Sequence, residues 1–62
     1  MKNLSEFDRI RAYDLAIDIT NTYDYIGFLD AWEDAKHFTT MEIFTAAYQE
    51  AENIWENQEV EF

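Results

Sequence analysis

The sequence predicts an all-α fold, a small antiparallel three-helix bundle with helices at about residues 4–18, 23–37 and 40–57. The chain has no proline and a single glycine, so few positions suit the tight turns of a hairpin-based fold. Apolar residues recur at helical spacing along most of the chain. Of the 62 residues, 18% are aromatic and 48% are hydrophobic, which is apolar content that disordered acidic chains lack. The chain is therefore expected to fold.

Residues 1–62 are expected to form one acidic helical domain with a short frayed acidic tail at about 58–62. The chain has no cysteine, which excludes disulfides and thiolate metal sites. It also has no run of 18 apolar residues and no apolar signal-peptide core near the N-terminus. The expected location is the cytoplasm, with no membrane as a partner.

The first predicted helix, at about 4–18, is apolar on two sides. One side contains Leu4, Ala12, Leu15 and Ile19, and the other contains Ile10, Tyr13 and Ile17. Such a helix is either sandwiched between neighbours or used for association, so the second side is a candidate for self-association. The alternation over residues 17–20 would also suit a short strand, but it has no obvious partner strand. Residues 20–22 are expected to form a polar connection that caps the next helix.

The second predicted helix spans about residues 23–37. Its apolar side contains Tyr25, Phe28, Leu29, Trp32 and Ala35, and its polar side contains Asp30, Glu33, Asp34 and His37. Gly27 inside this helix would cost roughly 1 kcal/mol relative to alanine. Tyr23 and Ile26 lie off the apolar side, which makes them candidates for exposed anchors in a protein interface.

The third predicted helix, at about 40–57, has the clearest start. Thr39 and Glu42 have capping-box spacing, and Phe38 and Ile43 have the spacing of a hydrophobic staple. The apolar side then contains Ile43, Phe44, Ala47, Tyr48, Ala51, Ile54 and Trp55. Both tryptophans of the chain fall on apolar helix sides, so we expect them in the core.

The residue inventory argues against an enzyme. Ser5 is the only serine, His37 is the only histidine, and Ser5 lies where a helix cap is expected. Asp30, Glu33, Asp34 and His37 share a helix face, but a metal would need ligands from a second helix. We expect a solvated face with a Glu33–His37 pair, and no metal or other cofactor. A metal-binding protein centred on His37 is a third-ranked alternative.

Charge is the most informative feature for function. The net charge is −10, and Lys36 is the only base after Arg11. Asp14 and Asp18, Asp30 and Asp34, and Glu52 and Glu56 are like-charged pairs four residues apart, which is the spacing of neighbours on a helix face. Rows of such carboxylates can imitate phosphates to a protein that grips nucleic acid, whereas direct binding to nucleic acid would need Lys and Arg.

The leading hypothesis is a small acidic inhibitor that occupies the basic nucleic-acid-binding surface of a partner protein. The expected partner-binding residues are Asp30, Glu33, Asp34, Glu42, Glu52, Glu56, Tyr23 and Ile26. In composition and size the chain resembles the compact acidic inhibitors of phages and toxin–immunity systems. The alternative is a helical interaction subunit or homodimer that associates through Ile10, Tyr13 and Ile17, with its acids serving solubility.

Overall fold

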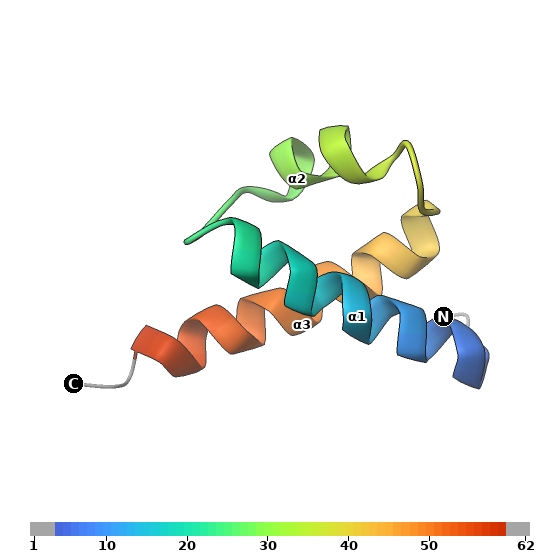
Figure 1. Cartoon of the computed structure of the whole chain (residues 1–62), viewed down its shortest axis with the longest axis horizontal. Coiled ribbons are helices and arrows are strands. Elements are labelled where there is room, and N and C mark those ends of the chain that lie inside the picture. Colours follow the sequence, from blue (N-terminus) through green and yellow to red (C-terminus); the bar gives the residue numbers. More distant parts are fainter. Residues whose placement is uncertain (1–3, 60–62) are drawn as a thin grey trace.

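The predicted all-α three-helix architecture is confirmed. The computed structural model describes residues 4–59, with side chains through residue 57. Its helices are α1 (Glu6–Thr22), α2 (Phe28–Ala35) and α3 (Met41–Glu59), and no strand occurs in this range. In Figure 1, α1 and α3 lie side by side and run in the same direction. The shorter α2, which comes between them in the sequence, runs in the opposite direction. The last part of the predicted acidic tail, residues 60–62, lies outside the described residues.

Helix α1 begins where its capping signal lies and ends later than expected. The hydroxyl of Ser5 accepts a hydrogen bond from the backbone N–H of Asp8 at 3.1 Å, which is an N-cap interaction. The predicted polar connection at residues 20–22 is wrong, because these residues continue the helix to Thr22. The hydroxyl of Thr20 donates to the carbonyl of Ile17 within the helix, so it is not free to cap α2.

The prediction that the second helix begins at residue 23 is also wrong. Residues 23–27 form a non-helical connection with a bend at residues 24 and 25, and Gly27 is the N-cap residue of α2 with φ −68° and ψ 157°. Gly27 therefore lies outside the helix and causes none of the expected helix-interior penalty. The helix ends at Ala35, and the segment that contains His37 is a turn. Two residues assigned to the apolar side, Tyr25 and Leu29, are exposed.

Helix α3 matches the predicted range to within two residues, but its cap is Thr40. The Thr40 hydroxyl accepts from the N–H of Ile43 at 3.3 Å, and the Thr40 carbonyl accepts from Phe44. Thr39 instead donates its N–H to Ala35 at the end of α2. The predicted capping box that starts at Thr39 is therefore wrong by one residue. Phe38, the outer member of the predicted staple, is 64% exposed.

Two kinds of packing hold the helices together. Small residues dominate where α1 meets α3, since Ala12 and Ala16 of α1 and Ala47 and Ala51 of α3 are all buried. Aromatic rings fill the space between α2 and α3. The Phe28 ring lies 5.0 Å from Phe44 and 5.1 Å from Tyr48, and Trp32 lies 5.3 Å from Phe44. The expected core positions Trp55 and Phe44 are buried, and Trp32 packs against the core while half-buried.

Candidate protein-binding surfaces

The acids of α2 are exposed, and one of them, Asp34, lies beside α1. Asp30 and Asp34 lie one helical turn apart, and both are exposed. Asp34 lines an open groove of about 390 Å³ together with Asp18 of α1, so the fold brings carboxylates from two helices to one hollow. No described Lys or Arg forms an ion pair with Asp18, Asp30 or Asp34. Asp18 was not among the expected partner-binding residues, although its place in the Asp14–Asp18 pair was a usable signal.

Tyr23 connects this acidic groove to the α1–α2 connection. Its hydroxyl donates a hydrogen bond of 2.5 Å to Asp34. That bond to the carboxylate, with smaller contributions from desolvation and from the negative charge of Asp34, raises the pKa of Tyr23 above its usual value. Tyr23 is half-buried and its carbonyl accepts from the Trp55 indole, so it ties the connection to both α2 and α3.

The remaining charged groups of α2 do not form the expected Glu–His pair. Glu33 instead forms an ion pair with Lys36 at 3.0 Å, and the side chains of Glu33 and Lys36 are 68% and 41% exposed. Such a pair contributes little to stability. His37 lies in the turn after α2, away from the helix face that carried it in the prediction. Among the described residues, no three His, Asp or Glu side chains come close enough together to hold a metal ion.

The expected partner-binding acids of α3 form a separate group. Glu42 and Glu56 are exposed and Glu52 is half-buried, and none of the three lines the groove that holds Asp18 and Asp34. Glu52 lies near the phenol of Tyr48. Burial is the main cause that raises the pKa of Tyr48 to about 12, and the nearby Tyr25 and Glu52 add to the shift.

The two expected aromatic and aliphatic anchors are less accessible than their positions predicted. Tyr23 and Ile26 are both half-buried and pack against the core. The carbonyl of Ile26 accepts a hydrogen bond of 2.6 Å from the Tyr48 hydroxyl. Both residues therefore hold the connection in place. Leu29, which is 72% exposed, and Tyr25, which is 62% exposed, are the apolar side chains that this part of the molecule presents to solvent.

The second apolar side of α1 lies on the surface. Ile10 is 56% exposed, Tyr13 is 59% exposed and Ile17 is 46% exposed, while Ala12, Ala16 and Ile19 on the other side are buried. No neighbouring helix of the described chain covers these residues. Phe7 is 65% exposed and extends the same face toward the N-terminus. Its position, three residues before Ile10, was a signal that the sequence contained. We call Phe7, Ile10, Tyr13 and Ile17 the outer face of α1.

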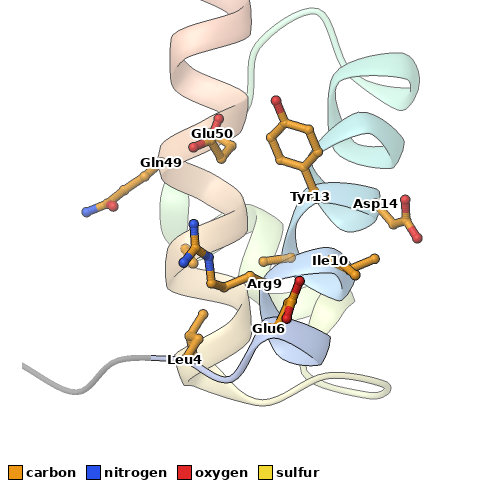
Figure 2. Close-up of a pocket in the computed structure, with 10 residues that line it drawn as sticks. Leu4, Glu6, Arg9, Ile10, Tyr13, Asp14, Gln49 and Glu50 are labelled. Carbon is orange, nitrogen blue, oxygen red and sulfur yellow. The ribbon is translucent and has the colours of Figure 1, made fainter.

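One edge of this outer face borders an open groove of about 740 Å³ between α1 and α3. Figure 2 shows Arg9 reaching from α1 toward α3, with Tyr13 and Glu50 on facing sides of the groove. Asp14 and Ile10 point away from α3 in the same view. The lining is a mixture of apolar, acidic and basic side chains with no convergent catalytic set.

Comparison with known proteins adds no assignment. No family model matches the chain, and neither a curated protein nor a solved structure matches it. In the part of the chain that the structure describes, no helix has the length and apolar character needed to cross a membrane.

Proposed function

We propose that this chain is a small acidic protein that binds a basic, nucleic-acid-handling protein and occupies its phosphate-binding surface. The observation that carries the proposal is the pair Asp30 and Asp34, exposed one turn apart on α2, with Asp34 beside Asp18 of α1 and no described Lys or Arg in an ion pair with any of the three. Carboxylates at helical spacing that no base neutralises present a row of negative charges to a basic surface, as a row of phosphates does.

The placement of the charges supports this proposal in two further ways. None of the described charged side chains is buried in the core, so the carboxylates can meet a partner without disrupting the fold. The imbalance is also concentrated after α1, where Lys36 is the only base and is engaged by Glu33. A field of one sign over α2 and α3 would speed encounter with a cationic protein, and this effect weakens as salt is raised.

The acidic groups of α2 and α3 have distinct roles in this proposal. Asp30 and Asp34 make direct contact with the partner. Glu33, Glu42, Glu52 and Glu56 contribute mainly to the surrounding field, and the exposed ring of Tyr25 and side chain of Leu29 supply apolar contact beside the acids. Tyr23 holds Asp34 in position through its hydrogen bond.

The test begins with capture of the partner on the tagged chain from the host, at moderate salt. Two variants with equal changes in net charge are then compared for affinity to the captured protein: Asp30→Asn/Asp34→Asn on α2 and Glu52→Gln/Glu56→Gln on α3. We expect the α2 variant to bind at least about tenfold more weakly than the α3 variant, a difference of about 1.4 kcal/mol. A fluorescent DNA or RNA ligand of the partner should be displaced by the wild-type chain.

Either of two results would overturn the proposal. In the first, the captured protein binds the wild-type chain and its nucleic acid at the same time. In the second, a variant with Asp30, Glu33, Asp34, Glu42, Glu52 and Glu56 all changed to their amides binds as tightly as the wild type.

A further inference from the structure

We infer that the outer face of α1 pairs with the same face of a second copy of this chain, with the two α1 helices antiparallel. This inference goes beyond the proposed function and does not rest on it. The starting observation is that Phe7, Ile10, Tyr13 and Ile17 are each between 46% and 65% exposed on one helix that buries its opposite side against α3. Ile10 and Ile17 are seven residues apart, so they lie almost in line along the helix axis.

The order of charges along α1 indicates that the outer face is covered by the α1 helix of a second copy. Arg11 precedes Asp14 and Asp18, and all three line a hollow beside the outer face, between α1 and the segment of Phe38, Thr39 and Ile43. When two copies pair antiparallel with Ile10 against Ile17 of the second copy, Arg11 lies level with residue 16 of that copy. It is then about 3 Å along the axis from both Asp14 and Asp18 of the second copy. Two-fold symmetry repeats the arrangement, so each arginine meets two carboxylates. The two Asp14 carboxylates face each other next to the two-fold axis, and both arginines lie within one helical turn of them.

A parallel arrangement lacks this complementarity. In a parallel pair of helices, Arg11 would lie level with Arg11 of the second copy, and Asp14 with Asp14. Arg11 also makes a cation–π contact within its own chain, which is the same in either arrangement. Its guanidinium lies 5.7 Å from the centre of the Phe7 ring, which holds the charge at the border of the apolar residues.

The distribution of charge over the whole chain is compatible with such a contact. Helix α1 contains Arg9 and Arg11, the two arginines of the chain, whereas the segment after it contains Lys36 alone. The least negative helix is therefore the one that pairs with its copy, and the acids of α2 lie outside the outer face of α1. One helix pair gives a small interface, so we expect a dissociation constant on the order of 10–100 µM.

Sedimentation equilibrium on the full chain tests the pairing. Over about 5–500 µM, the mass should rise from that of a 7.4 kDa chain toward twice that value. Ile17→Asp should abolish the rise, whereas Leu29→Asp, which places the same charge at an exposed position of α2, should leave it in place. Arg11→Glu should weaken pairing at least about tenfold. Lys36→Glu makes an equal change in net charge on α2 and should have a much smaller effect. Circular dichroism checks that every variant keeps its helices.

Cysteine cross-linking tests the direction of the helices, because the chain contains no cysteine of its own. Asp14 lies next to the expected two-fold axis, so Asp14→Cys should form a disulfide-linked dimer under mild oxidation. In an antiparallel pair, position 21 of one copy lies more than about 20 Å from position 21 of the other, so Asn21→Cys should stay monomeric. A wild-type chain that stays monomeric to about 500 µM overturns the inference. Equal effects of the matched variants, or efficient cross-linking through Asn21→Cys, also overturn it.

Discussion

Tyr48 shows how a single polar atom can join three parts of this molecule. Its ring packs against Phe28 of α2 and Trp55 of α3, while its hydroxyl donates to the carbonyl of Ile26 in the connection. The ring is buried, and the hydroxyl has a partner that the connection positions. The connection and α2 are therefore held to α3 by one side chain as well as by apolar packing.

Tyr48→Phe is expected to lower the free energy of unfolding by about 1 kcal/mol near neutral pH, because it removes a hydrogen bond and leaves the carbonyl of Ile26 without that donor. The ring packing is retained. Urea unfolding followed by circular dichroism measures the loss. A variant as stable as the wild type would mean that water replaces the hydroxyl without penalty.

The same tyrosine predicts a dependence on alkaline pH. Its pKa is raised from about 10 in the unfolded chain to about 12 in the fold, so folding favours the protonated phenol. The resulting stabilisation is complete below about pH 10 and is lost as the pH rises toward 12. The stability difference between wild type and Tyr48→Phe should therefore shrink over that range. A constant difference between pH 9 and pH 12 would contradict the assignment.

At the level of elements, the start of α2 lacks a side-chain cap, so a substitution there can stabilise the fold. Gly27 adopts φ and ψ values that any residue can adopt, and it supplies no side-chain cap. A Cβ at this position would meet the Asp30 carboxylate at an ordinary 3.8 Å. Gly27→Ser should raise the free energy of unfolding by about 0.5–1 kcal/mol, through a new cap and a less flexible unfolded chain. Thermal unfolding measures it, and a decrease would show that the position needs glycine.

The start of α3 allows a comparison between adjacent threonines. Thr40→Ala should lower the free energy of unfolding by about 1 kcal/mol, because its hydroxyl caps the helix. Thr39→Ala should have a much smaller effect, since the interaction that places Thr39 uses its backbone N–H. Chemical denaturation of both variants distinguishes them. Equal losses of unfolding free energy in the two variants would indicate that Thr39 also caps α3.

Sequence periodicity predicted the range of α3, but it placed the end of α1 too early and the start of α2 too early. The apolar residues of α3 recur over five turns, so its range and buried side followed directly from the pattern. The two apolar sides of α1 were likewise visible. The eight residues of α2 give too few repeats, so Leu29 of α2 and Tyr25 of the preceding connection were assigned to a core that they do not enter. Which apolar residues a short helix buries depends on the tertiary arrangement.

For the candidate surfaces, the sequence predicted the features within a single helix but not the contacts between helices. The acids of α2 and the outer face of α1 followed from spacing within a helix. The meeting of Asp18 with Asp34, and the hydrogen bond from Tyr23 to Asp34, join residues on different elements. Helical periodicity contains no information about such contacts, because they depend on how α1 and α2 lie against each other.

At the scale of the whole molecule, charge should oppose folding of the free chain. With a net charge of −10 and no described charged side chain in the core, like charges repel across the surface. Screening shortens from about 30 Å at 0.01 M salt to about 10 Å at 0.1 M. The free energy of unfolding should therefore rise by an amount on the order of 0.5–1 kcal/mol between these conditions. The melting temperature should rise by a few degrees. Differential scanning calorimetry measures the change.

A variant with fewer acids provides the control for this salt effect. Asp30→Asn/Asp34→Asn/Glu52→Gln/Glu56→Gln removes four negative charges from exposed or half-buried sites and should show a smaller rise. A melting temperature that falls with salt would indicate that attractive pairs outweigh repulsion. Salt should act in the opposite direction on partner binding, which it weakens.

The aromatic layer between α2 and α3 has a practical consequence for spectroscopy. Both tryptophans, Trp32 and Trp55, belong to that layer, and α1 has none. Trp55 donates its indole N–H to the carbonyl of Tyr23, and the hydroxyl of Tyr23 donates to Asp34, so a ligand that docks on Asp34 should change the indole emission. Association through α1 should leave that emission unchanged and alter only the signal of Tyr13. The fluorescence of the unlabelled chain can therefore distinguish the two binding events.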